Sequence, residues 1–302
     1  MDGQITFATR QPISIYVFLT LFIGQVGCAT LQVPPSLSEE VRVMPEGYEL
    51  VWSDEFNKDG RPNPENWTYE HGFVRNRELQ WYQPENAFCQ HGMLMIEGRR
   101  ERKKNPNYNP TVDEWTLNRK FAEYTSASLT TKGLHSWKFG RFEMRARIDT
   151  RPGLWPAFWT MGVEGSWPDR GEIDIMEYYR GMILANVGWS ANQLWKAKWD
   201  SQTKNINTMG SGWAERFHVW RMDWDESAIK LYVDDLLLNT TDLKDTLNPP
   251  DRNAPRNPFH QPHYILVNLA IGGSQGGDPS TTDFPARYEI DYVRVYQKKT
   301  VE

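Results

Sequence analysis

Short apolar runs alternate with polar residues along most of the chain after residue 47. The clearest example is the segment 140–148, in which Phe142, Met144, Ala146 and Ile148 alternate with charged side chains. A period of two buries one face of a segment and leaves the other polar, as in an antiparallel strand. Similar short segments bounded by turn residues are predicted as strands at 48–52, 93–97, 217–224, 229–233, 264–271 and 288–296. Since no helical period extends over a long window, the pattern predicts an all-β fold.

One β-sandwich domain over residues 46–298 accounts for this pattern. The chain of 302 residues contains no internal repeat and no second composition regime, and the polar stretches 99–120 and 191–213 are expected to be loops. A net charge of -5 gives no electrostatic reason to expect nucleic acid binding, and two cysteines exclude a disulfide scaffold. The 14 tryptophans instead suggest a site lined by aromatic rings.

The N-terminal segment has the pattern of an export signal. Its apolar run, residues 13–24, is too short to span a membrane but fits the core of a signal peptide. We therefore expect a signal peptide over residues 1–28 and a Pro-rich linker over 29–45. The expected location is outside the cytoplasm: secreted, periplasmic or anchored to an outer membrane. Cys28 follows a glycine as in a bacterial lipobox, although Gln25 stands where an aliphatic residue is usual, so a lipid anchor at Cys28 is an open alternative.

Three acids lie close together in the segment 171–178: Glu172, Asp174 and Glu177. On a regular strand Glu172 and Asp174 share a face, whereas Glu177 is one position late, and only a β-bulge would return it to that face. Carboxyl groups that share one face raise one another's pKa, which is the arrangement that glycoside hydrolysis uses. A solvated acidic strand face is the simpler alternative. The catalytic interpretation is favoured by nearby aromatic residues on which sugars could stack, namely Trp155, Trp159, Trp189, Trp195 and Trp199.

These residues resemble glycoside hydrolase family 16, and in particular its bacterial laminarinase-like branch of endo-β-1,3-glucanases. The family signature Glu-x-Asp-x-x-Glu is present in its bulged form over 172–177. Further blocks resemble the family in the same order at 50–56, 76–82, 124–126, 137–143, 155–159, 217–220, 268–273 and 291–296. The resemblance implies a β-jelly-roll sandwich with an open cleft across its concave sheet. It also implies hydrolysis of internal linkages in a β-linked polysaccharide with retention of configuration.

The resemblance also implies roles for single residues. Glu172 would be the nucleophile, Asp174 the assisting acid and Glu177 the acid/base, with no cofactor in catalysis. Asn76 lies where the family has an asparagine that lines the glycone subsites. Trp155 and Trp159 match the aromatic floor of the family's cleft.

A structural calcium ion is common in the family, and Glu55 and Asp291 resemble its ligands. Calcium takes six to eight oxygen ligands, so these two acids would be a partial set. The alternative is that both are ordinary surface acids.

Departures from the laminarinase pattern concern the substrate. Ser128 stands where laminarinases commonly have arginine, Gly188 where they have histidine, and the segment 272–277, with Gln275, lacks the usual Trp-Pro. Because a site that loses matched donors discriminates its hydroxyl pattern less well, the glycan is left open. A β-1,3-glucan or mixed β-1,3/1,4-glucan is expected. An agar-type galactan or a mucin-type glycan, cut by an endo-β-galactosidase, is the alternative.

A non-catalytic lectin-like module on the same sandwich is the competing class of function. Such a module would have no reason to retain the three acids in register. For the catalytic interpretation we expect a monomer whose partner is its polysaccharide substrate.

Overall fold

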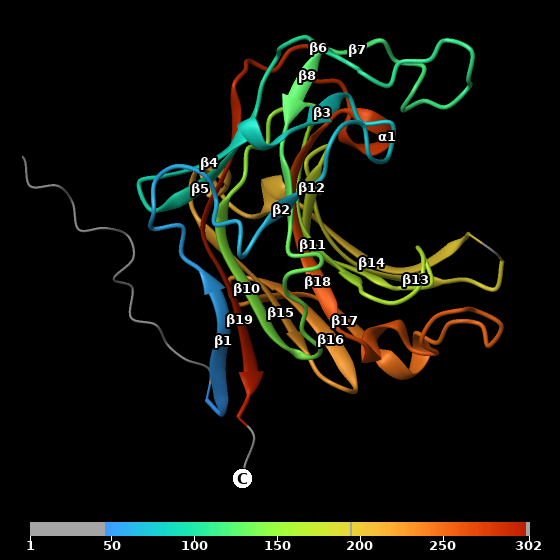
Figure 1. The fold of residues 1–302 in the computed structure, drawn as a ribbon. Helices are drawn as coiled ribbons and strands as arrows, with labels where there is room; N and C mark the ends of the chain where they lie inside the picture. The colour runs from blue at the N-terminus through green and yellow to red at the C-terminus, as the bar shows by residue number, and fades with distance from the viewer. Residues whose placement is uncertain (1–45, 194, 300–302) are drawn as a thin grey trace, which may run out of the picture. The chain divides into compact units, whose positions relative to one another are not determined.

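The computed structural model describes residues 46–193 and 195–299. The predicted signal peptide 1–28, Cys28 and the linker 29–45 lie outside the described residues. Within the described residues two antiparallel sheets face one another (Figure 1), which confirms the predicted all-β sandwich. No helix among these residues has the length and apolar character needed to cross a membrane.

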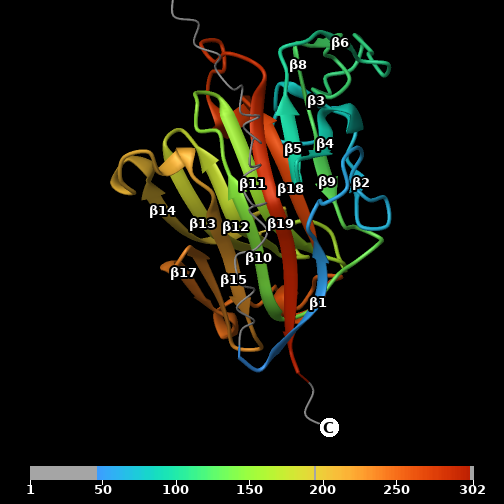
Figure 2. The same cartoon turned by 90° about the vertical axis from the view of Figure 1, so that its left-hand side faces the viewer.

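The larger sheet contains most of the strands that alternation predicts. Strand β10 is the segment with the clearest alternation, and it lies between β15 and β19. Figure 2 shows β10, β19 and β1 side by side. The order across the sheet is β17 (Leu236–Asp242), β16 (Ala228–Val233), β15 (His218–Trp224), β10 (Gly140–Arg147), β19 (Ala286–Lys298), β5 (Met93–Gly98) and β4 (Ala87–Gln90), with β1 (Tyr48–Asp54) also paired to β19.

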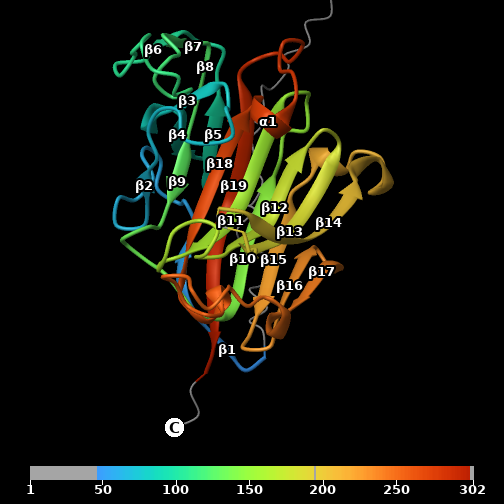
Figure 3. The same cartoon turned by 90° about the vertical axis from the view of Figure 1, so that its right-hand side faces the viewer.

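The smaller sheet carries the three acids on β12, an inner strand, and Figure 3 shows its strands side by side. Its order is β14 (Ala197–Asn205), β13 (Met182–Ser190), β12 (Glu172–Tyr179), β11 (Leu154–Gly162), β18 (His263–Ile271), β9 (Ser128–Thr130) and β2 (Thr68–Tyr69). Two short pairs complete the strands of the described residues: β3 (Gln80–Tyr82) with β8 (Tyr124–Ser126), and β6 (Lys103–Lys104) with β7 (Phe121–Ala122).

The core lies between the two sheets. Phe142, Met144 and Ala146 of β10 are fully buried there, as the alternation predicts. From the smaller sheet, Ile173 and Ile175 of β12 enter the same cluster. Burial of large apolar side chains contributes about 1.5–3 kcal/mol each. The other face of the smaller sheet is therefore the one left for a site.

One stretch expected to be a loop differs from the prediction. Within 191–213, residues Ala197–Asn205 form β14, an edge strand paired with β13 along its whole length. Its side chains are mostly exposed, so no apolar alternation marks it in the sequence. The stretch 99–120 is largely irregular, as expected, apart from the two residues of β6.

The helical segments within residues 46–193 and 195–299 are all short. They are α1 (Gly273–Gly276), η2 (Pro84–Asn86), η3 (Ile206–Thr208), η4 (Trp213–Glu215), η5 (Leu243–Asp245) and η6 (Pro258–His260). Of these, α1 follows β18 directly and lies beside the loop that precedes β3, where the Ser274 amide donates to the Asn76 carbonyl over 2.8 Å (Figure 1).

Candidate active site

A β-bulge in β12 brings the three acids to one face. Between Asp174 and Glu177 the strand has two residues, Ile175 and Met176, while the facing strand β13 has one. The side chains of Ile175 and Met176 are both buried in the core. Glu172, Asp174 and Glu177 consequently line the same cleft, as the bulge prediction required. The cleft has a volume of about 720 Å³.

The register of four neighbouring strands arranges the cleft floor in three rows. Each row crosses β11, β12, β13 and β14 in that order, and each contains one of the acids. The rows are Met161, Glu172, Gly188 and Trp199; Trp159, Asp174, Asn186 and Ser201; and Ala157, Glu177, Leu184 and Thr203. The side chain opposite each acid is therefore fixed by backbone pairing.

Different N–H donors hold the acids. The Trp167 indole donates to Glu172 Oε2 over 2.6 Å, and the Trp155 indole donates to Glu177 Oε1 over 2.8 Å. Asn186 Nδ2 donates to two carboxyls, Asp174 Oδ2 at 3.1 Å and Glu177 Oε2 at 3.2 Å. Both oxygens of Glu177 thus accept a hydrogen bond from a neutral donor.

Burial raises the pKa of all three carboxyls, but their neighbours differ. For Glu177, burial and the charge of Glu172 raise the pKa to about 7, despite the hydrogen bonds from Trp155 and Asn186. For Asp174, burial and the charges of both glutamates raise the pKa well above its usual range. For Glu172, burial raises the pKa, whereas the Trp167 hydrogen bond and the charge of Arg75 lower it. Glu172 is therefore the acid whose pKa a neighbouring cation lowers, whereas the charge of another carboxyl raises the pKa of Asp174 and of Glu177.

Two tryptophans predicted as an aromatic floor line the cleft. Trp155 and Trp159 are both on β11 and mostly buried, so each shows only part of its ring to the cleft. The Trp159 indole donates to Asn268 Oδ1 over 2.7 Å, and Asn268 in turn donates to the Tyr82 hydroxyl over 3.1 Å. This chain of hydrogen bonds fixes the orientation of the Trp159 ring.

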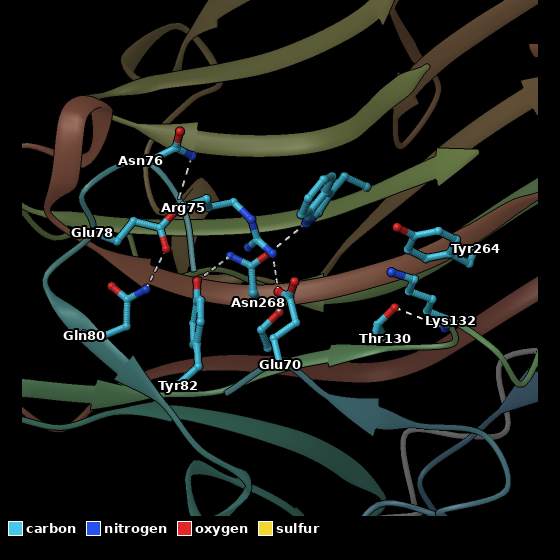
Figure 4. A network of polar contacts seen from close by, with 12 residues as sticks. Glu70, Arg75, Asn76, Glu78, Gln80, Tyr82, Thr130, Lys132, Tyr264 and Asn268 are labelled. Carbon is cyan, nitrogen blue, oxygen red and sulfur yellow. Dashed lines mark hydrogen bonds and ion pairs between the residues drawn. The ribbon is translucent and has the colours of Figure 1, made fainter. Parts of the chain in front are cut away.

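A polar network lies at the end of the cleft near β3 (Figure 4). Arg75 lines the cleft, stacks 4.9 Å from the centre of the Trp159 ring and pairs with Glu70. Asn76, which lines the cleft as predicted, donates to Glu78 Oε1 over 3.3 Å. A cation placed over an indole face is attracted to it, so Trp159 and Glu70 together hold the guanidinium in place.

The network changes the interpretation of Ser128. Its hydroxyl donates over 2.6 Å to Glu70 Oε2, on the carboxylate that pairs with Arg75. The serine at position 128 therefore does not leave the cleft without a guanidinium, since Arg75 supplies one from another segment. Gln275 of α1 lines the cleft at the same end, as predicted.

The three tryptophans that follow the acids in the sequence lie in different surroundings. Trp199 lines the cleft, but Trp189 is 4 % exposed and packs in the core between the sheets, so it is not a sugar platform. The prediction for Trp189 is wrong because Gly188 faces the cleft and the next residue along a strand points to the opposite face. Trp195 is 63 % exposed in the turn before β14 and is not among the residues that line the cleft.

Comparison with known proteins places this geometry in a family. The model of glycosyl hydrolases family 16 matches residues 98–294. The chain belongs to glycosyl hydrolase family 16. It is a glycoside hydrolase of the β-sandwich kind, as the sequence resemblance indicated.

Relatives of this family 16 hydrolase include the beta-glucanase of Rhodothermus marinus, 37 % identical over 272 residues that cover 83 % of this chain and 85 % of that protein. Among solved structures, the Rhodothermus marinus laminarinase is 36 % identical, with a TM-score of 0.67 over 84 % of this chain and 98 % of that chain. A structure described among endo-acting O-glycanases that initiate mucin breakdown in the human gut microbiota is 34 % identical. Its TM-score is 0.77 over 85 % of this chain and 93 % of that chain.

Glu55 and Asp291 do not fit the role of calcium ligands in this family 16 chain. Both oxygens of Glu55 accept hydrogen bonds from Arg294, at 2.9 and 2.7 Å, and Asp291 pairs with Arg145 at 2.8 Å. Within residues 46–193 and 195–299, no group of three or more His, Cys, Asp or Glu residues could hold a metal ion. Two carboxylates already neutralised by arginines are a poor ligand set for a divalent cation.

Several residues that line the cleft of the hydrolase were missed from the sequence, and three of them contact the acids or the aromatic floor: Arg75, Trp167 and Asn186. Asn186 carried a usable signal, because it lies two residues before Gly188 and therefore on the same face of β13. Trp167 and Arg75 come from loops, whose side-chain directions no alternation predicts.

Proposed function

We propose that this hydrolase is a retaining endo-β-glycosidase that cuts internal linkages of a β-1,3-glucan or a mixed β-1,3/1,4-glucan. The observation that carries the proposal is the bulged strand β12, which brings three acids of different electrostatic surroundings to one cleft. A retaining mechanism needs one carboxylate that is ionised and one carboxyl that is protonated before the first step.

The roles follow from the neighbours of each acid. Glu172, whose anion is favoured by Trp167 and Arg75, attacks the anomeric carbon and forms a glycosyl ester as the glycosidic bond breaks. Glu177, with a pKa of about 7, gives its proton to the leaving oxygen. The Glu177 carboxylate then takes a proton from water, whose oxygen attacks the same carbon and releases Glu172. Asp174, whose pKa burial and the charges of both glutamates raise well above its usual range, lies between the two and hydrogen-bonds them.

The names of the relatives support the glucan. The Rhodothermus marinus protein is a beta-glucanase, and the solved structure from that organism is a laminarinase. Because 37 % identity extends over most of both chains, a shared polysaccharide class is the simplest expectation.

A second candidate substrate is a mucin-type or galactan-type glycan that contains β-linked galactose. Two observations favour it. The structure described among mucin O-glycanases has the higher TM-score, 0.77 against 0.67 for the laminarinase. In addition, Gly188 stands where laminarinases commonly have histidine.

Product analysis tests both candidates. Purified protein is incubated with laminarin, mixed-linkage glucan, agarose and mucin O-glycans, and the products are followed by chromatography and by NMR of the new anomeric centre. We expect oligosaccharides that first appear in the β configuration. Glu172→Gln should abolish hydrolysis while polysaccharide binding persists, and retained hydrolysis would refute the assignment of the nucleophile.

Export and a lipid anchor at Cys28 belong to the proposal as well. The apolar run 13–24 and the glycine before Cys28 support them. In a bacterial host, Cys28→Ser should move the protein from the membrane fraction to the soluble extracytoplasmic fraction. An unchanged distribution would contradict the anchor. Size-exclusion chromatography with light scattering tests the expected monomer.

A further inference from the structure

We propose that Trp199, lying over Gly188, is the stacking platform of a sugar subsite beside the acids, and that the pair determines how this subsite recognises its sugar. The inference rests on the proposed function, because it assigns a subsite of the same cleft. It adds that recognition there is by ring stacking rather than by hydrogen bonds to hydroxyl groups.

Gly188 is required by the indole and not by its own backbone. A Cβ atom added at Gly188 would lie 2.5 Å from Cζ3 of Trp199 and 2.8 Å from its Cε3 and Cη2. Gly188 does not have a left-handed φ angle, so any residue could adopt its backbone conformation. The close approach of the Trp199 ring is thus the reason that a side chain does not fit at residue 188.

The ring occupies the place of the missing side chain and remains open to the cleft. Trp199 is 41 % exposed and lines the cleft together with Glu172. Its neighbours on the cleft face of β14, Ser201 and Thr203, are small and polar. A half-exposed indole is a large apolar surface that water solvates poorly, and the C–H face of a pyranose can cover it.

The register places the platform at a defined distance from the reaction. Glu172 pairs with Gly188, and Gly188 pairs with Trp199, so two strand spacings separate Glu172 from Trp199, about 10 Å between their backbones. Arg75, next to Asn76 in the sequence, lies over the Trp159 ring of β11, so it is on the other side of β12 from Trp199 of β14. The indole therefore contacts a sugar next to the one attacked, on the side away from Asn76.

The chemistry of this subsite differs from that of a donor site. A donor at residue 188 would read the pattern of hydroxyl groups on the sugar. An indole without such a donor reads the exposed C–H face and accepts any pyranose that presents one. The pair therefore relaxes discrimination between sugars at this subsite while it retains affinity.

The experiment compares Trp199→Ala, Gly188→Ala, the double variant and Trp195→Ala. Trp195→Ala is a matched control, because Trp195 is on the same hairpin, more exposed and outside the cleft lining. Initial rates are measured on whichever of laminarin, mixed-linkage glucan, agarose or mucin O-glycans the wild type cuts fastest. Binding of each variant is also measured in the Glu172→Gln background by affinity electrophoresis in gels containing that polysaccharide.

We expect Trp199→Ala to raise KM about tenfold, with kcat nearly unchanged, because the stack binds substrate and transition state alike. Gly188→Ala should raise KM to a similar extent by displacing the ring. The double variant should be no worse than Trp199→Ala, because the clash is absent without the ring. Trp195→Ala should match the wild type, and all four proteins should retain the wild-type unfolding temperature.

A wild-type KM for Trp199→Ala, or additive effects of the two substitutions, would overturn the platform. That failure is distinguishable from failure of the proposed function. If the wild type cuts none of the four polysaccharides, the function fails; if it cuts one and Trp199→Ala retains the wild-type KM and gel mobility, only the platform fails.

Discussion

Replacing Trp155 by phenylalanine removes one N–H donor from Glu177 and leaves an aromatic ring in the floor. The Trp155 indole donates to Glu177 Oε1 over 2.8 Å, which stabilises the ionised carboxylate and lowers its pKa. Without this donor the anion is less stable, so the pKa of Glu177 should rise above about 7. Because the first step needs protonated Glu177, the pH at which activity declines on the basic side should rise with it.

The size of the shift follows from the hydrogen bond. A hydrogen bond to a charged group contributes about 1.5–3 kcal/mol, and about 1.4 kcal/mol corresponds to one pKa unit. The upper estimate is therefore about two units, and water that enters the vacated space would recover part of it. Asn186 still donates to Glu177 Oε2, so we expect a shift of about one unit.

The assay is the pH dependence of kcat/KM between pH 4 and 10 on the polysaccharide that is cut fastest. The basic limb of Trp155→Phe should move upward and the acidic limb should stay in place. Because the comparison uses the shape of the profile, a general loss of affinity at the floor does not affect it. A basic limb that stays in place or moves downward would refute the assignment of Glu177 as the acid.

Three other substitutions test separate parts of the structure. Trp167→Phe removes the indole donor of Glu172, so the pKa of that carboxyl should rise. The acidic limb of the same pH profile should then move upward while the basic limb stays, and an unchanged acidic limb would contradict Glu172 as the nucleophile. Asn186→Ala frees two carboxyls at once and should lower kcat/KM about 10- to 100-fold with an upward shift of the basic limb, whereas wild-type kinetics would show that Asn186 positions nothing. Phe142→Ala leaves a cavity in the core and should lower the free energy of unfolding by about 3–5 kcal/mol, measured by urea titration with Val51→Ala, at an exposed site, as the control.

The sequence predicted features that depend on one strand alone. The strand β10 was predictable because its alternation is complete over eight residues. The bulge in β12 was predictable because three acids at this spacing can share a face only if one residue is extra. In both cases the periodicity of a single segment contains the information.

Features that depend on pairing between strands were not predictable in the same way. Trp189 and Trp199 are both tryptophans near the acids, yet one is in the core and the other in the cleft. The face of Trp189 depends on the register of β13 against β12, and that of Trp199 on the register of β14 against β13, since a slip of one residue moves a side chain to the opposite face. The edge strand β14 has no buried face of its own, so its sequence carries no alternation from which that register could be inferred.

The separate roles of Glu172 and Glu177 also arise from the groups that surround each carboxyl and not from residue type. Both are glutamates on one strand, and burial raises the pKa of each. They differ because Arg75, held over Trp159 by Glu70, lowers the pKa of Glu172, while the charge of Glu172 raises the pKa of Glu177. The loop before β3 therefore contributes to the division between nucleophile and acid, although no residue of that loop belongs to the Glu-x-Asp-x-x-Glu signature.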